Sequence, residues 1–179
     1  MAQIETARLM LRSLQASDVD VLVGLWSDPE VTHYMGGPRD SAQVRRTLED
    51  ELQAHTEDPI HFWVVVEKVS RRVVGDCGLI RKDVDGRAEI ELTYVIAPDA
   101  WGKGYGTEAA AGVRDDAFGR LGVVRLVALI DPENAASARV AEKIGMQLEK
   151  ETLRPSGAVR RVYAMPGPSP APLLRPCCC

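Results

Sequence analysis

The stretch Trp101-Gly102-Lys103-Gly104-Tyr105-Gly106-Thr107-Glu108-Ala109 decides the fold, because it places alternate glycines between an apolar strand-like run and an alanine-rich helical run. Glycine has no side chain to keep a ligand off the backbone, and it tolerates the φ values that direct consecutive N–H groups inward. The following helix adds unpaired N–H groups and the positive end of its dipole. We therefore expect this loop to hold an anion such as a pyrophosphate, although a tight strand-to-helix turn would show the same pattern.

Two other nucleotide-binding patterns can be tested on the same loop. A P-loop needs Ser or Thr directly after its lysine, whereas Lys103 is followed by Gly104, so that pattern is excluded. A dinucleotide-binding fingerprint that starts at Gly102 needs glycine where the chain has Thr107. Asp131 could still imitate the acid that binds ribose. A nucleotide-binding domain therefore remains an alternative.

Composition indicates one globular domain. The chain has 179 residues, of which 45% are hydrophobic and 27% charged, and this is enough for one sizeable core. A net charge of −4 gives no basis for binding nucleic acid or an acidic membrane surface. No apolar run approaches the roughly 20 residues of a membrane span, and the N-terminus lacks a signal-peptide layout. We expect a cytoplasmic protein with no nucleic-acid or membrane partner.

The cysteines and histidines do not predict a metal site. Cys77 lies inside the body of the chain, and the other three cysteines are its last residues, 177–179. Adjacent cysteines lack the spacing of metal ligands, and the histidines at positions 33, 55 and 61 are scattered. We expect no metal, a single domain over residues 1–165, and a proline-rich disordered tail over residues 166–179.

Hydrophobic periodicity predicts an α/β protein with about seven strands and about four helices. The expected strands span residues 4–14, 62–66, 73–80, 88–97, 123–130, 146–152 and 158–165. The expected helices follow N-caps at Ser17 and Ser41, run through 110–121, and extend from about Asn134 to Ile144. Brief connections make the strands between 62 and 97 antiparallel, whereas the strands on either side of the glycine loop and its helix should be parallel. The antiparallel beginning argues against a Rossmann fold.

Separated stretches of the chain agree in order and spacing with one known family. They are Arg8-Leu9-Met10-Leu11-Arg12, Asp28-Pro29-Glu30-Val31, Glu91-Leu92-Thr93-Tyr94, the loop from Trp101 to Ala109, Asn134-Ala135-Ala136-Ser137 and Glu142-Lys143-Ile144-Gly145-Met146. Together they resemble the GNAT acetyltransferases over about residues 5–165, and more narrowly the RimJ/RimL-type branch, which includes ribosomal-protein N-terminal acetyltransferases. The resemblance implies a mixed sheet, antiparallel in its N-terminal part, that opens into a seam between parallel fourth and fifth strands.

The resemblance also implies a ligand and a reaction. In that family the pantetheine arm of acetyl-CoA lies in the seam and its pyrophosphate lies on the glycine loop. We therefore expect an N-acetyltransferase that moves an acetyl group directly to a primary amine, on a small molecule or at a protein N-terminus. The implied cofactor-binding residues are Tyr94, Val95, Ile96, Trp101, Gly102, Lys103, Gly104, Tyr105, Gly106, Thr107, Asn134 and Ser137. His33 and Tyr34 are the candidate acceptor-binding residues, and a homodimer is left open.

Two positions depart from the family pattern. Trp101 replaces a Gln or Arg that is common at the start of the loop motif, which is harmless if the loop binds through backbone N–H groups. Ala141 stands where many relatives carry a tyrosine thought to protonate the leaving thiolate. The resemblance suggests Ser137, one turn earlier on the same face of the helix, as its replacement. A protein that binds acyl-CoA but does not catalyse acetyl transfer therefore remains an alternative interpretation.

The chemistry of acetyl transfer asks for two further groups. An amine must lose a proton to attack a thioester, so a carboxylate is useful, and Glu91 lies on the strand that leads into the glycine loop. Glu91 could instead be a surface residue, like Glu89. The developing oxyanion needs a donor, which we expect to be a strand N–H near residues 94–96, where the sheet opens.

Overall fold

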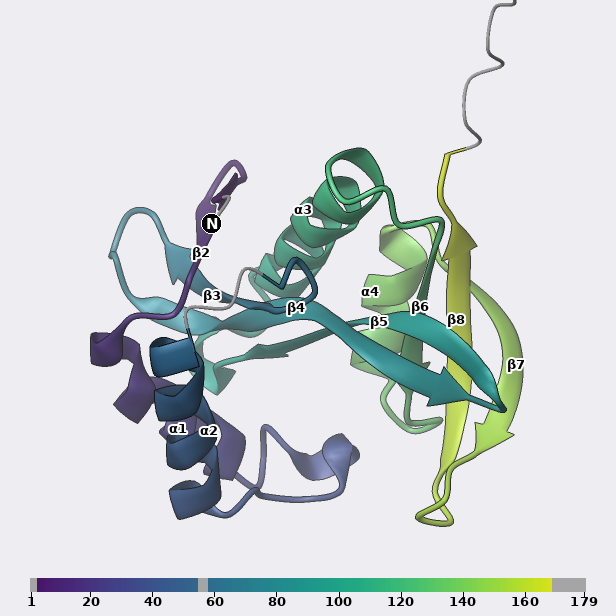
Figure 1. Ribbon diagram of the computed structural model, residues 1–179, viewed down its shortest axis with the longest axis horizontal. Helices are drawn as coiled ribbons and strands as arrows, with labels where there is room; N and C mark the ends of the chain where they lie inside the picture. The colour runs from purple at the N-terminus through teal and green to yellow at the C-terminus, as the bar shows by residue number, and fades with distance from the viewer. Residues whose placement is uncertain (1–2, 55–57, 169–179) are drawn as a thin grey trace, which may run out of the picture.

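The computed structural model describes residues 3–54 and 58–168, which form one mixed sheet flanked by helices (Figure 1). The sheet has the strand order β1-β2-β3-β4-β5-β6-β8-β7. Its strands are β1 (Ile4–Glu5), β2 (Leu9–Arg12), β3 (Phe62–Glu67), β4 (Val73–Val84), β5 (Arg87–Ile96), β6 (Arg125–Ile130), β7 (Gln147–Leu153) and β8 (Val159–Pro166). The helices are α1 (Val19–Ser27), α2 (Ser41–Ala54), α3 (Tyr105–Gly119) and α4 (Ala135–Lys143), with short 3-10 turns η1 (Ala16–Asp18), η2 (His33–Met35) and η3 (Pro98–Ala100).

The predicted α/β class and its helices are confirmed, with a correction to the number of strands. Where the sequence predicts one strand over residues 4–14, the chain forms β1 and β2, paired antiparallel with Ile4 opposite Leu11. Thr6 explains the turn, because its backbone N–H donates to the Leu9 carbonyl and its hydroxyl accepts from the Leu9 N–H. The sheet therefore has eight strands rather than seven.

Two predicted helix caps are wrong. The N-cap of α2 is formed by Asp40, not Ser41, because the Asp40 carboxylate accepts a hydrogen bond of 2.8 Å from the Gln43 N–H. Ser17 lies within η1, and α1 begins only at Val19. In both places the true boundary is within two residues of the predicted one. The predicted tail falls on residues 166–179, of which 169–179 lie outside the described residues.

The helices cover opposite faces of the sheet. On one face, α3 buries Ala109, Val113 and Ala117 against a core that includes Leu92 and Ile96 of β5. On the other face, α1 and α2 pack over β3, around Leu22, Val64 and Val66 (Figure 1). None of the helices in the described part of the chain is long and apolar enough to cross a membrane.

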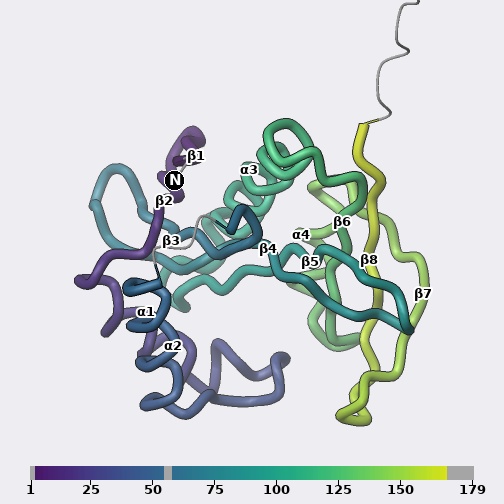
Figure 2. The backbone as a smooth tube through the Cα atoms, in the orientation of Figure 1, coloured from purple at the N-terminus to yellow at the C-terminus, as the bar shows by residue number. Residues whose placement is uncertain are grey.

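The predicted parallel seam is confirmed between β5 and β6. β5 pairs with β4 antiparallel along its whole length. Within the described residues, β5 meets β6 at one point alone, Glu91 opposite Val127, in parallel. Beyond that point the two strands separate, and β6 continues alongside β8 (Figure 2). The C-terminal half of β5 therefore presents an edge toward β6 that is not covered by a neighbouring strand.

Candidate active site

The glycine loop forms the N-terminal end of α3. Gly102 and Gly104 have φ values of 75° and 82°, in the left-handed region that favours glycine. Gly104 is the N-cap residue and makes no side-chain cap bond, and the first intrahelical bond runs from the Glu108 N–H to the Gly104 carbonyl. The three N–H groups before Glu108 therefore point out of the helix end, where the helix dipole favours an anion.

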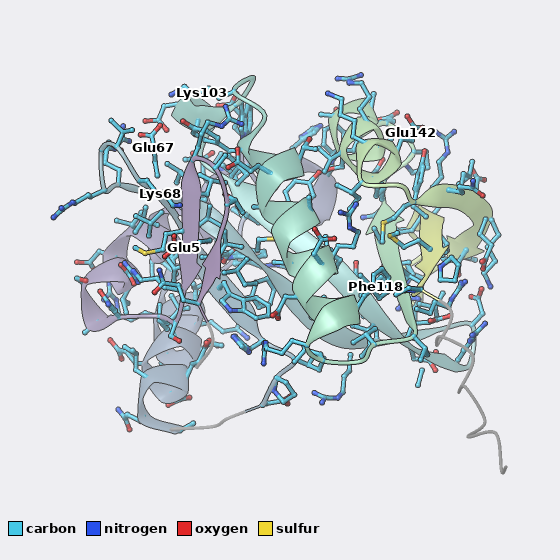
Figure 3. The ribbon with its side chains drawn as sticks, turned by 90° about the horizontal axis from the view of Figure 1, so that it is seen from above. Glu5, Glu67, Lys68, Lys103, Phe118 and Glu142 are labelled. Carbon is cyan, nitrogen blue, oxygen red and sulfur yellow. The ribbon has the colours of Figure 1, made fainter. Side chains whose placement is uncertain are left out.

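Arg8, from the segment just before β2, holds this loop in place through a hydrogen bond and an ion pair. Its guanidinium donates to the Lys103 carbonyl at 2.8 Å and forms an ion pair with Glu108 at 2.7 Å. It also lies 4.8 Å from the centre of the Tyr105 ring. Glu108 balances the charge of Arg8, so the contribution of Arg8 is to hold the loop against β2. Figure 3 shows Lys103 at this end of α3 and Phe118 at the other.

The loop is fastened to the end of β5. The Trp101 indole N–H donates to the Ile96 carbonyl at 2.6 Å. A Cβ added at Gly106 would lie 3.3 Å from the ring of Tyr94. The Tyr94 ring therefore packs directly against the first turn of α3. Thr107 continues this turn, half-buried, one residue later. The structure thus brings the two predicted cofactor-binding segments, 94–96 and 101–107, side by side.

The backbone of β5 directs donors into the seam. The Ala97 N–H donates to the Val74 carbonyl on β4 at 2.8 Å. Because N–H groups alternate between the two edges of a strand, the Val95 N–H also faces β4, whereas those of Tyr94 and Ile96 face β6. These two N–H groups lie where the strands have already separated. They can serve as donors to a ligand in the seam.

Glu91 lies on β5 at the point where the seam begins. Its side chain is 8% exposed, and this burial raises the pKa of the carboxyl, although Lys82 and the Leu129 N–H partly oppose the shift. Glu89 is equally buried but forms ion pairs with Arg125 at 3.1 Å and with Arg87. For Glu91 no such ion pair is found within the described residues. Of these two acids, Glu91 is thus the one available to accept a proton.

Ser137 and Tyr94 meet across the seam. Asn134 caps α4, and its side chain accepts a hydrogen bond of 3.0 Å from the Ser137 N–H. The Ser137 hydroxyl in turn accepts a hydrogen bond of 3.1 Å from the Tyr94 hydroxyl, which leaves the serine proton available to another acceptor. Burial raises the pKa of Tyr94 to about 12, so its hydroxyl stays protonated. Ala141, one turn further along α4, is buried and offers no proton.

The turn η2 carries the predicted acceptor-binding pair. The rings of His33 and Tyr34 make an edge contact, with 4.6 Å between their centres. Arg160 of β8 donates to the Tyr34 carbonyl at 3.2 Å and forms an ion pair with Asp131 at 2.7 Å. The positive charge of Arg160 also helps to lower the pKa of Glu91. Arg160 therefore links η2 to the surroundings of Glu91, while the His33 side chain itself is exposed.

Two residues of interest are not among those predicted from the sequence. Arg8 contacts a loop 95 residues away, and nothing in its local pattern indicates that contact. Asp76 is a buried acid near the start of β4, and its only signal is one charged residue within the apolar run 73–80. Among the described residues, no cluster of His, Cys, Asp and Glu side chains could hold a metal ion.

Comparison with known proteins agrees with this geometry. Residues 8–147 match the acetyltransferase (GNAT) domain family. The uncharacterized N-acetyltransferase p20 of Bacillus licheniformis is 34% identical over 152 residues, which cover 83% of this chain and 84% of p20. The spermidine N(1)-acetyltransferase of Escherichia coli K12 is 28% identical over 147 residues, covering 80% of this chain and 75% of that enzyme.

A solved structure shows the same fold with coenzyme A. The ribosomal L7/L12 alpha-N-protein acetyltransferase RimL, in complex with coenzyme A, aligns with a TM-score of 0.75 at 15% identity. The alignment covers 93% of this chain and 98% of RimL. The chain belongs to the GNAT acetyltransferase family and is an acetyl-CoA-dependent acetyltransferase.

Proposed function

We propose that this protein moves the acetyl group of acetyl-CoA directly to a primary amine, in the manner of the RimJ/RimL-type branch. The observation that carries the proposal is the convergence, around one opened seam, of an uncapped helix N-terminus, strand N–H groups and a buried carboxylate. The relatives act on amines of two kinds by name, a polyamine and a ribosomal protein N-terminus. The likeness to RimL supports the branch at the level of the fold.

The glycine loop fits the pyrophosphate of acetyl-CoA. A Cβ at Gly102 would meet nothing within 4 Å, and one at Gly104 would meet only Arg8, at 3.5 Å. Both glycines therefore face open space, and a phosphate can approach their backbone. The N–H groups of residues 105–107 would bind the phosphate oxygens. Arg8 would hold the loop in place through the Lys103 carbonyl. When bound, acetyl-CoA supplies a thioester whose carbonyl carbon accepts the amine and whose thiolate leaves.

Glu91 is the proposed general base. It would take the proton that the amine nitrogen loses as the new C–N bond forms, directly or through one water molecule. A base works best when its pKa lies near the working pH, and burial moves the pKa of Glu91 upward in that direction. The N–H groups of Tyr94 and Ile96 would stabilise the negative charge that develops on the carbonyl oxygen.

Ser137 is the proposed donor to the departing sulfur. As the C–S bond breaks, its hydroxyl proton would hydrogen-bond the thiolate, whose conjugate acid has a pKa near 8.5 if cysteine is taken as a guide. Tyr94 would act as a positioning residue, because its hydrogen bond to Ser137 leaves the serine proton free for this task. Asn134 would hold Ser137 in place through the helix cap.

An acetyl-transfer assay tests the proposed function. The protein is incubated with acetyl-CoA and a panel of amines that contains spermidine, simple monoamines and short peptides with free N-termini. We expect at least one amine to be acetylated, with one molecule of CoA released for each acetyl group transferred. Binding of CoA without any acetylated product would instead indicate an acyl-CoA-binding module, and it would contradict the proposal.

A further inference from the structure

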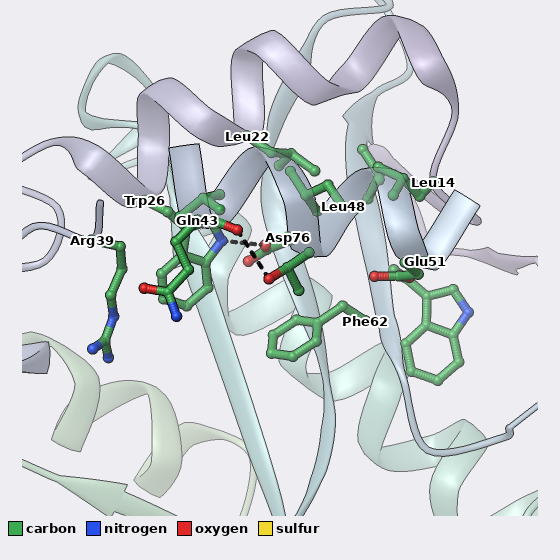
Figure 4. Close-up of a pocket in the computed structure, with 13 residues that line it drawn as sticks. Leu14, Leu22, Trp26, Arg39, Gln43, Leu48, Glu51, Phe62 and Asp76 are labelled. Atoms are coloured by element: carbon green, nitrogen blue, oxygen red, sulfur yellow. Dashed lines mark hydrogen bonds between the residues drawn. The ribbon is translucent and has the colours of Figure 1, made fainter. Parts of the chain in front are cut away.

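A cavity of about 390 Å³ lies between α1, α2, β3 and β4, on the face of the sheet opposite α3 (Figure 4). Its walls are mainly apolar, with contributions from Leu22, Trp26, Leu48 and Phe62. The rings of Trp26 and Phe62 meet edge to face, with 6.4 Å between their centres. A cavity of this volume and lining accommodates a small organic ligand.

Asp76 contributes an oxygen without a partner to this cavity. The residue is 5% exposed. Its Oδ2 accepts a hydrogen bond of 2.8 Å from the Trp26 indole, but its Oδ1 is buried and has no hydrogen-bond partner within the described residues. In Figure 4 the carboxylate lies among Trp26, Gln43 and Phe62. Burying a carboxylate oxygen without a donor is costly, so this oxygen indicates that a ligand supplies the donor.

The charges around the cavity favour a cation as that ligand. The other charged side chains that line it are Glu51 of α2 and Arg39 just before that helix. Arg39 is exposed, and its guanidinium donates to the Met35 carbonyl. Two acids against one base leave the cavity with a net negative charge. The aromatic rings of Trp26 and Phe62 add faces and edges on which an organic cation can pack.

We propose that this cavity binds an organic monoammonium ion with an apolar body, whose ammonium group donates to Asp76 Oδ1. Asp76 lies opposite Val95, four residues and so about 13 Å along the strand from Glu91, and an ammonium group held there is therefore not the amine that Glu91 would deprotonate. Asp76 pairs with Val95 of β5, so it lies one strand in from the seam. Because Val95 and Glu91 are four residues apart on one strand, Asp76 also shares a face of the sheet with Glu91. The cavity thus lies on the same face of the sheet as Glu91 but further along the strands, and it is a binding site separate from the proposed reaction.

Binding of such an ion should depend on pH. Burial and the nearby charge of Glu51 raise the pKa of Asp76, the Trp26 hydrogen bond lowers it, and together they give a pKa of about 7. The pKa of Glu51 is also raised, by loss of hydration. Protonation of either acid removes an attraction for the cation. The affinity for an ammonium ion should therefore fall as the pH is lowered.

Calorimetric titration of the protein without acetyl-CoA tests the proposal directly. The probes are butylamine, hexylamine and 2-phenylethylamine, each compared at pH 8 with the alcohol of the same carbon skeleton. We expect saturable binding of at least one amine, about 10-fold or more tighter than that of its alcohol, as one charge-assisted hydrogen bond requires. Asp76→Asn should remove this preference, because an amide can still accept from Trp26 but carries no charge. Asp50→Asn, an exposed acid next to Glu51, should leave it unchanged.

The outcomes separate the cavity from the reaction. If no amine binds, or if Asp76→Asn binds the amine as tightly as the wild type, the cavity proposal is overturned. Should Asp76→Asn fail to fold, the wild type decides: with a pKa of about 7, binding should weaken about 10-fold from pH 8 to pH 6, and a flat profile would overturn the proposal. Acetyl transfer without binding in the cavity would leave the proposed function standing. Binding without transfer to any amine would leave the cavity site standing and remove the function.

Discussion

The hydroxyl of Tyr94 donates a hydrogen bond of 3.1 Å to the hydroxyl of Ser137, and this bond connects the two sides of the opened seam. Tyr94 comes from β5, which leads into the glycine loop, whereas Ser137 comes from the first turn of α4. Asn134 holds the same serine by its backbone N–H. Two neighbours thus fix Ser137, and its remaining proton is the one that a leaving thiolate can use.

Replacing Ser137 by alanine should slow acetyl transfer by about 10-fold or more, the effect of one lost charge-assisted hydrogen bond. The helix cap should survive, because Asn134 bonds the backbone N–H of residue 137. The Tyr94 hydroxyl would lose its partner, so the free energy of unfolding should fall by about 1 kcal/mol. The measurements are steady-state kinetics and urea denaturation.

Tyr94→Phe is the matched variant and should reduce turnover less, since it leaves the serine proton in place. Normal turnover in Ser137→Ala together with failure of Asn134→Ala would move the role away from Ser137.

Replacing Gly104 by valine should abolish the binding of CoA, because a β-branched side chain would occupy the space in front of the helix end. The backbone at Gly104 also has a positive φ, which any substitution strains. Gly122→Val controls for that strain, because Gly122 has a positive φ and open space but lies beyond the C-terminal end of α3. Calorimetry should show CoA binding to the Gly122 variant and none to the Gly104 variant. Equal affinities would show that the loop does not hold the pyrophosphate.

Replacing Glu91 by glutamine should lower kcat by about 10² to 10⁴-fold while the affinity for acetyl-CoA stays unchanged, as for the loss of a general base. The deficit should shrink at high pH, where the amine deprotonates without help. Kinetics over a range of pH values measure both effects. Glu89→Gln is the control, since Glu89 is held by Arg125 and its loss should reduce stability more than turnover. Turnover at the wild-type rate near neutral pH in Glu91→Gln would place the base elsewhere.

The buried carboxyl of Asp76 should make stability depend on pH. Its pKa of about 7 in the folded protein lies above the ordinary value of 3.8, so between these values the folded state binds more protons than the unfolded state. Stability should therefore fall as the pH rises toward 7 and then level off. A shift of this size corresponds to roughly 4 kcal/mol as an upper bound.

The variant Asp76→Asn isolates that contribution. Urea denaturation should show it to be more stable than the wild type at pH 8, by a margin that narrows as the pH is lowered toward 5. The Trp26 indole keeps an acceptor in the amide oxygen, so its hydrogen bond is retained in the variant. A wild type that is as stable as the variant at every pH would mean that Asp76 is not buried in its charged form.

Local patterns in the sequence were sufficient for much of the fold. The alternate glycines after an apolar run predicted the start of α3, and Asn134 predicted the cap of α4, because both depend on residues within one or two helical turns. The division of residues 4–14 into two strands was missed, since it depends on the hydroxyl of Thr6.

The candidate site was harder to predict, because its contacts join distant parts of the chain. Arg8 reaches Lys103 across 95 residues, and Tyr94 reaches Ser137 only because β5 and β6 separate. The unpaired oxygen of Asp76 depends on how α1, α2 and β3 pack around it. No spacing rule within one segment carries that information.

The central claim of direct transfer is tested most directly by initial-rate kinetics with acetyl-CoA and an amine that the protein acetylates. The concentrations of acetyl-CoA and amine are varied together, and the enzyme is examined by mass spectrometry after incubation with acetyl-CoA alone. Direct transfer predicts intersecting double-reciprocal lines, an acetylated amine equal in amount to the CoA released, and no acetylated enzyme. Parallel lines with a covalent acetyl-enzyme, the pattern of a ping-pong reaction, would contradict the account.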